Sequence, residues 1–408
     1  MTPAGDRARA PGANLMLVLT ATMAVGPLLT HSLSAMSPLV IADLGLTESQ
    51  FGLLATVTFF AAAVTAVRTG RWADRLGART LLVVMFGGAA LSMLLTAVAP
   101  GYGVLLAAMV LSGLGQVMAN PTTNRLIRLH VPAHRRGSWL GVKQAGVQAA
   151  QLVAGLVFPA LGLLLGWRTA VVAAAGVTLL LLVHGWRTVP DNGGAPAPRP
   201  SGTTPGPGGG AAGARAPMPG VVRAYAAAAA LTGLGAQAAN VYLPLYAHRE
   251  LGLDVITAGA TVSVAALVGI VSRVLWARVM DRPDADGFAL LVMMSLGAAA
   301  SAALLVLAPL HPGLAWAVWP AAVLHGGAAL AVSVVVMSGA MRAVPAERVG
   351  ASTGVVTMGL YAGFCSGPLV LGGLLQVTGS FAVGWGVVLV CYLACGVLAV
   401  LVRRRPRL

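Results

Sequence analysis

The chain has 408 residues, of which 58% are hydrophobic and 9% charged, and its mean hydropathy is +0.85. This composition excludes a soluble globular domain and indicates a helical protein that crosses a membrane many times. A net charge of +15 would suggest nucleic acid as the partner of a soluble protein. Here the basic residues fall in the loops on one side of the predicted spans, so we attribute the charge to membrane topology.

Twelve apolar runs follow one another along the chain, each long enough to cross a hydrocarbon core of about 30 Å. The first six cover residues 15–38, 48–68, 79–99, 102–124, 137–163 and 168–187, and the second six cover residues 222–246, 255–277, 287–308, 314–340, 349–376 and 380–402. They predict an all-α polytopic membrane protein with twelve transmembrane helices in two six-helix bundles.

The runs divide the chain into five parts. We expect an N-terminal tail at 1–13, a bundle at 14–188, a linker rich in proline and glycine at 189–220, a second bundle at 221–402 and a basic tail at 403–408. The linker composition cannot offset the entropy of ordering, so we expect neither secondary structure nor a binding role there. Because nearly all arginines fall on one side, both tails and the linker are predicted to be cytoplasmic, and the membrane to be the inner (plasma) membrane.

A short basic segment separates the second and third runs. Its motif residues are Gly70, Asp74, Arg75, Gly77 and Arg79, spaced as Gly-x-x-x-Asp-Arg-x-Gly-x-Arg. We expect this segment to be a membrane-surface loop in which the acid and the arginines form a charge cluster that closes one face of the protein. The alternative is a solvated loop that only sets topology.

This pattern resembles the loop between helices 2 and 3 of the major facilitator superfamily (MFS) of secondary transporters, with departures at Trp72 and Ala78. The resemblance implies two bundles around a central cavity, transport by alternating access, and a gating role for the motif residues. The halves of the chain also repeat: Leu44-Gly45-Leu46 recurs as Leu251-Gly252-Leu253, and Asp74-Arg75 recurs as Asp281-Arg282. Asp281 and Arg282 therefore predict a second, looser gate.

Ionisable residues are rare within the predicted spans. Every acid lies in a loop or at a span end, so coupling to protons through an intramembrane carboxylate is not supported. The single lysine, Lys143, falls inside the fifth span beside a stripe formed by Gln144, Gln148 and Gln151. We predict that Lys143 attracts an anionic group of the substrate and that the glutamines hydrogen-bond to it. Alternatively, Lys143 snorkels to the cytoplasmic surface and the glutamines tie helices together.

Four further polar residues are candidates for the substrate site. Gln237 and Asn240 lie three residues apart on the seventh span, His31 lies on the first and Tyr361 on the eleventh. A pair of amides can also be an interhelical tie, and a membrane histidine, here His31 or His325, can be purely structural.

Together these observations predict a secondary active transporter that moves a small molecule, an organic anion or a polar metabolite. Efflux of hydrophobic drug-like compounds and a non-transporting receptor of the same fold are the alternatives. We expect no enzymatic activity, because no nucleophile, base or metal cluster occurs in the spans. We also expect no cofactor or metal, no nucleic-acid partner, and a monomer whose partners are its substrate and the bilayer.

Overall fold

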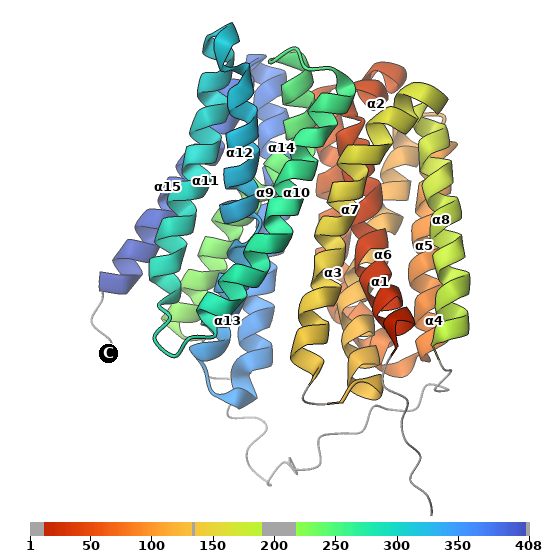
Figure 1. The fold of residues 1–408 in the computed structure, drawn as a ribbon, viewed down its shortest axis with the longest axis vertical. Helices are drawn as coiled ribbons and strands as arrows, with labels where there is room; N and C mark the ends of the chain where they lie inside the picture. The colour runs from red at the N-terminus through yellow and green to blue at the C-terminus, as the bar shows by residue number, and fades with distance from the viewer. Residues whose placement is uncertain (1–11, 133–134, 190–217, 405–408) are drawn as a thin grey trace, which may run out of the picture.

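The computed structural model describes residues 12–132, 135–189 and 218–404. Most of the predicted linker (190–217) and of the predicted tails (1–11 and 405–408) lies outside these residues. Figure 1 shows two groups of long helices side by side, with the N-terminal half in red to yellow-green and the C-terminal half in green to blue.

The N-terminal half forms six membrane-crossing segments. It contains α1 (Ala13–Ala35), α2 (Ser37–Leu44), α3 (Glu48–Arg75), α4 (Ala78–Leu82), the π turn η1 (Val83–Gly87), α5 (Gly88–Ala97), α6 (Tyr102–His130), α7 (Arg136–Leu165) and α8 (Trp167–Thr188). The short α2 follows directly after α1, and α4, η1 and α5 together make the third crossing.

The C-terminal half repeats this plan. It contains α9 (Gly220–Arg249), α10 (Val255–Met280), α11 (Gly287–Leu307), the 3-10 turns η3 (Ala308–Leu310) and η4 (Pro312–Ala317), α12 (Val318–Leu324), the π turn η5 (His325–Ala329), α13 (Val332–Arg342), the 3-10 turn η6 (Ala346–Arg348), α14 (Val349–Thr378) and α15 (Phe381–Arg404). Segments α12, η5 and α13 make one crossing. The predicted fold of two six-helix bundles is confirmed.

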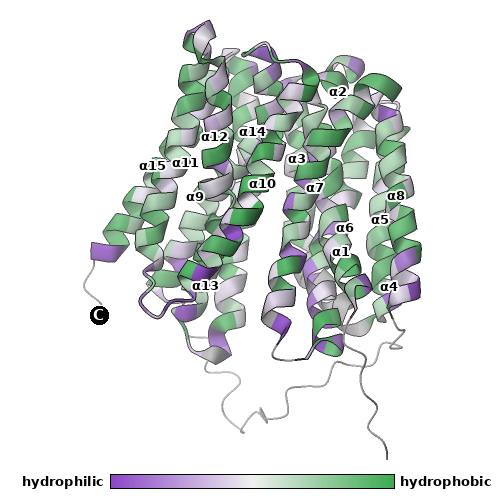
Figure 2. Cartoon of the chain, in the orientation of Figure 1, coloured by the Kyte–Doolittle hydropathy of each residue, from purple (hydrophilic) through white to green (hydrophobic). Residues whose placement is uncertain are grey.

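Eleven of the crossings are apolar and long enough to span a bilayer. The twelfth, α9, has its apolar stretch interrupted by Gln237 and Asn240 and is buried along most of its length. Figure 2 shows the corresponding pattern, with hydrophobic residues along the middle of the helices and hydrophilic ones gathered at their ends. A helix with these polar residues can cross the membrane here because neighbouring helices, rather than lipid, surround most of it.

The repeated Leu-Gly-Leu triplet has a structural cause. Gly45 ends α2 with φ of 59°, and Gly252 follows α9 with φ of 68°. Both lie in the left-handed region, which glycine enters without the steric penalty of a Cβ atom. The repeat therefore marks the same turn at the same end of the two bundles.

The motif segment after the second crossing is not the loop that the sequence predicted. Helix α3 continues to Arg75 and α4 begins at Ala78, so the connection consists of Leu76 and Gly77. With a rise of about 1.5 Å per residue, a helix of 28 residues is longer than the hydrocarbon core is thick. The backbone of α3 therefore continues as a helix through the charged part of the motif, beyond the apolar layer.

Asp286 stabilises the start of α11. Its carboxylate accepts hydrogen bonds from the backbone amides of Phe288 (3.0 Å) and Ala289 (3.1 Å), and the Arg403 guanidinium donates to it at 2.7 Å. Burial alone would raise the pKa of Asp286, but these hydrogen bonds hold the pKa below its usual value. This stabilisation is fully present at pH values above the pKa that Asp286 has in the unfolded chain. It is lost as the pH falls through the lower pKa that Asp286 has in the folded protein.

We therefore expect Asp286→Ala to lower the free energy of unfolding by about 1 kcal/mol, the usual effect of removing an N-cap. A lower melting temperature of the detergent-purified protein at pH 7 would show this. Asp284→Ala, an exposed change in the same loop, is the control. Equal melting temperatures for the two variants would contradict the capping role.

Candidate functional site

Lys143 lies buried between α7 and α6, with 2% of its surface exposed. Its ammonium donates hydrogen bonds to Thr123 Oγ1 at 2.7 Å, Asn124 Oδ1 at 2.7 Å and Asn120 Oδ1 at 3.2 Å. The three acceptors come from one face of α6, since residues three and four apart on a helix lie above one another. We call this arrangement the lysine cage. It directs the ammonium to α6 rather than to the membrane surface, which argues against the snorkelling alternative.

Among the residues that the structure describes, the lysine cage holds no negative charge that would compensate the ammonium. An ammonium has three N–H groups, and all three are used on oxygens that carry no net charge. Asn120 and Asn124 are themselves exposed, so the cage lies directly beneath an accessible surface of α6. A buried cation with only neutral partners favours an approaching anion.

A second polar cluster joins the two bundles at mid-height. Gln151 Nε2 on α7 donates to Asn240 Oδ1 on α9 at 3.0 Å, and His325 Nε2 in η5 lies 3.3 Å from the same oxygen. Because that oxygen can only accept, His325 carries a proton on Nε2. Asn240 Nδ2 lies 3.4 Å from Gln237 Oε1 and donates to it. The alternative of an interhelical tie, left open by the sequence, is therefore realised for Gln151 and Asn240.

Gln144 and Gln148 continue the stripe along α7 without completing their hydrogen bonds. The Oε1 atom of each is buried and has no partner among the described residues, and Gln148 is 3% exposed. Gln237 Nε2 on α9 is in the same situation. These three atoms are available to a polar group that enters the site.

His31 and Tyr361 make no described hydrogen bond to either cluster. His31, on α1, is 7% exposed, and no described hydrogen bond joins it to the lysine cage or to Asn240. Tyr361, on α14, packs its ring against Phe59 and Phe364, with ring centroids 6.4 and 6.2 Å away. An aromatic contact between α3 and α14 is therefore its described role, and binding of substrate by either residue stays a prediction.

The two bundles meet at the end that carries Glu48 and Arg249, which we call the outer end because the sequence predicts it to face outward. Arg249 forms an ion pair with Glu48, and Tyr242 Oη donates to the Glu48 carbonyl at 2.6 Å. Deeper in, Thr56 donates to the Cys365 carbonyl at 2.9 Å and Ser263 to the Leu152 carbonyl at 2.9 Å. The hydrogen bonds, ion pair and ring contacts described between the bundles all lie between this end and mid-height.

The predicted gate residues occupy the opposite end. Gly70 lies within the backbone of α3, and the side chains of Asp74 and Arg75 lie outside the described part of the structure. Gly77 precedes α4, and Arg79 donates to the Val189 carbonyl at 3.0 Å.

Arg79 also lies over the Trp186 ring at 5.4 Å, so its described contacts remain within the N-terminal bundle. Asp281 and Arg282 are exposed after α10, and the Arg282 carbonyl accepts from Arg342 at 3.2 Å. The gating role of these residues stays a prediction.

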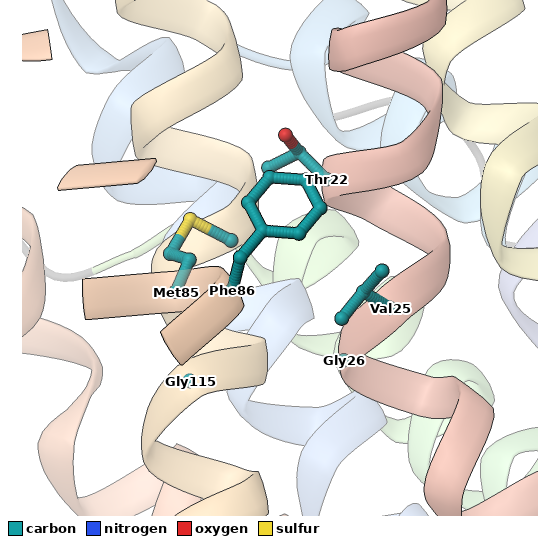
Figure 3. Close-up of a pocket in the computed structure, with 6 residues that line it drawn as sticks. All are labelled: Thr22, Val25, Gly26, Met85, Phe86 and Gly115. Carbon is teal, nitrogen blue, oxygen red and sulfur yellow. The ribbon is translucent and has the colours of Figure 1, made fainter. Parts of the chain in front are cut away.

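A small cavity lies between α1, η1 and α6 (Figure 3). Thr22, Val25 and Phe86 are among its lining residues, and it has room for about one water molecule. None of the predicted site residues lines it. We assign it no role in binding.

Sequence reasoning missed the acceptors of the lysine cage. Asn120 and Asn124 lie four residues apart on the fourth span, a spacing that could have marked them as one polar face. That spacing shows which residues share a face, but it does not show that the face meets Lys143.

The fold and these buried polar clusters define a twelve-helix membrane protein built from two related bundles. Residues 15–368 match the family model described as Major Facilitator Superfamily. The chain belongs to this superfamily, as the motif of the first half indicated.

Curated relatives match shorter stretches. An uncharacterised MFS-type transporter of Mycobacterium tuberculosis is 31% identical over 32% of this chain and 23% of its own length. A probable sulfoacetate transporter of Cupriavidus necator is 26% identical over 39% of this chain and 38% of its own. A gallate transporter of Pseudomonas putida is 25% identical over 38% of this chain and 35% of its own length. The chain thus matches less than two fifths of the length of each of these relatives.

Solved structures match over nearly the whole chain. A bacterial homologue of the human lysosomal transporter Spinster, inward-facing and unoccupied, has a TM-score of 0.71 at 17% identity, covering 98% of this chain and 96% of that one. The nucleoside transporter NupG has a TM-score of 0.73 at 13% identity, and the match covers 96% of this chain and 100% of that one. At these identities the similarity concerns the fold.

Proposed function

We propose that the protein is a secondary transporter that moves a small organic anion across the inner membrane by alternating access. The observation that carries this proposal is the lysine cage: a buried ammonium whose partners Asn120, Thr123 and Asn124 supply no negative charge. Holding a cation in this way is unfavourable unless a counter-charge arrives, and a substrate anion supplies one. Superfamily membership provides the two-bundle framework for transport.

The relatives support an anionic substrate. Three relatives are named as transporters of sulfoacetate, gallate and hexuronate. Each of these compounds carries a negative charge at neutral pH. The described hydrogen bonds, ion pair and ring contacts between the bundles lie between the outer end and mid-height, which supports an inward-facing state with cytoplasmic termini. We infer that the anion reaches Lys143 from the cytoplasmic side in this state.

Transport by the purified protein in sealed proteoliposomes tests the proposal. We expect uptake of a radiolabelled carboxylate such as 4-hydroxybenzoate, and loss of that uptake in Lys143→Met. Uptake of uncharged or cationic drugs that is equal in the wild type and in Lys143→Met would show instead that the cage is structural and the substrate is not an anion.

A relative from Pseudomonas aeruginosa named a transcription regulatory protein is 32% identical over 38% of this chain and 39% of its own length. This name favours a second candidate function, a membrane receptor that binds the same anion without moving it. Binding of the anion without any uptake in proteoliposomes would identify the receptor.

A further inference from the structure

Gln148 and Gln237 lie at the same level of the membrane, in different bundles. Helices α7 and α9 are the fifth and seventh crossings, so both run in the same direction. The bond between Gln151 and Asn240 fixes their register. Gln148 precedes Gln151 by three residues and Gln237 precedes Asn240 by three, so each lies about one helical turn from that bond, on the same side.

The two glutamines present complementary atoms that do not reach each other. Gln148 Oε1 is an acceptor without a donor, and Gln237 Nε2 is a donor without an acceptor. Both side chains are 3% exposed, so bulk water does not compensate for the missing bonds. The Gln148 acceptor and the Gln237 donor lie at one level and do not bond to each other. A group placed between them that both donates and accepts a hydrogen bond would satisfy the two atoms.

The neighbouring residues hold this pair in place. Asn240 Nδ2 donates to Gln237 Oε1, which orients the Gln237 amide so that its Nε2 atom points away from Asn240. His325, in the π turn η5, also bonds to Asn240. Such turns interrupt regular helix hydrogen bonding and occur frequently at functional sites.

We propose that Gln148 and Gln237 form a subsite for an uncharged hydrogen-bonding group of the substrate, a hydroxyl in the first instance. The inference rests on the proposed transport of an organic anion and names its substrate class as hydroxylated organic anions. Gln148 Oε1 accepts a hydrogen bond from the hydroxyl, and Gln237 Nε2 donates a hydrogen bond to the hydroxyl oxygen. A site with buried polar groups that need these bonds rejects the analogue that lacks the hydroxyl.

Binding of matched compounds to the detergent-purified protein tests the subsite, with melting temperature and calorimetric affinity as readouts. The anionic probes are 4-hydroxybenzoate and benzoate, and the neutral probes are 4-hydroxybenzamide and benzamide. We expect the wild type to bind 4-hydroxybenzoate at least about 10-fold more tightly than benzoate, a modest fraction of the discrimination that such sites achieve.

Three variants assign the effect. Gln148→Met and Gln237→Met should each reduce the preference for the hydroxyl to about 3-fold or less, because one of its two bonds is lost. Gln116→Met is the matched control, since Gln116 Oε1 is also buried without a described partner but packs against Gly26 within the N-terminal bundle. Its preference should equal that of the wild type.

The outcomes separate this inference from the proposed function. Equal binding of benzoate and 4-hydroxybenzoate by the wild type would overturn the subsite while leaving anion binding in place. A hydroxyl preference confined to the neutral pair and lost in Gln237→Met would support the subsite and overturn the anionic substrate. A preference that persists unchanged in both glutamine variants would assign hydroxyl recognition to other residues and overturn the inference.

Discussion

Asn124→Asp should raise the thermal stability of the protein and lower its affinity for organic anions by at least about 30-fold. Asn124 Oδ1 lies 2.7 Å from the Lys143 ammonium, so a carboxylate in its place becomes a permanent counter-ion. The ion pair replaces a neutral hydrogen bond and is therefore stronger. An incoming anion then meets a negative charge at about 4 Å, where repulsion is worth up to about 4 kcal/mol near a protein surface.

Asn124→Ala is the matched control, and its effects should have the opposite sign. Removing the acceptor leaves one N–H of the ammonium without a partner, so the melting temperature should fall. The affinity for anions should stay the same or rise, because the cage has lost a competitor for Lys143. Melting curves and calorimetric titrations with 4-hydroxybenzoate measure both quantities. If Asn124→Asp bound the anion as tightly as the wild type, the anion would not approach Lys143.

Gly372→Val should prevent the bundles from closing at the outer end. A Cβ atom on Gly372 would overlap the Tyr242 hydroxyl and approach the Glu48 carbonyl to 3.1 Å. These atoms form part of the outer contact, since Tyr242 donates to that carbonyl. Forcing extra atoms into a packed contact costs about 1–3 kcal/mol, which changes the ratio of closed to open outer ends by about 5- to 150-fold.

Labelling of an introduced cysteine by an impermeant thiol reagent measures this shift. We would place the cysteine at Ser49, which bonds to Gln376 across the outer contact, after changing the three native cysteines to serine. Labelling should be faster in Gly372→Val than in the parent. Gly373→Val adds the same side chain one residue later, where a Cβ atom meets nothing within 4 Å, and should label at the parental rate. Equal labelling of both variants would show that this contact does not control the outer end.

The sequence predicted the number and order of the crossings because hydropathy alone decides which segments can lie in lipid. It also identified Lys143, Gln151 and Asn240, since polar side chains are rare in such segments and therefore conspicuous. It could not assign their partners. The period of a helix orders residues around its own axis, whereas the contacts between Lys143 and α6, or between Gln151 and α9, depend on how the helices are placed in space.

The motif segment shows a different limit. Its charges indicated a position at the membrane surface, and the inference of a loop followed from treating charge as incompatible with a spanning helix. A helix can continue past the surface, as α3 does to Arg75, because its backbone hydrogen bonds are satisfied within the helix. Hydropathy finds the edge of the apolar layer, which need not be the end of the helix.

Asn240 Oδ1 accepts hydrogen bonds from two donors in different bundles. His325 belongs to the C-terminal bundle, as Asn240 does, whereas Gln151 belongs to the N-terminal bundle. In the proposed alternating access, the bond to His325 can move intact with the C-terminal half, and the bond to Gln151 must be exchanged. The energetic cost of that exchange falls on a single amide of α7. A ligand atom that accepts from Gln151 as it leaves Asn240 would lower the barrier to rocking, so that an occupied carrier would reorient faster than an empty one.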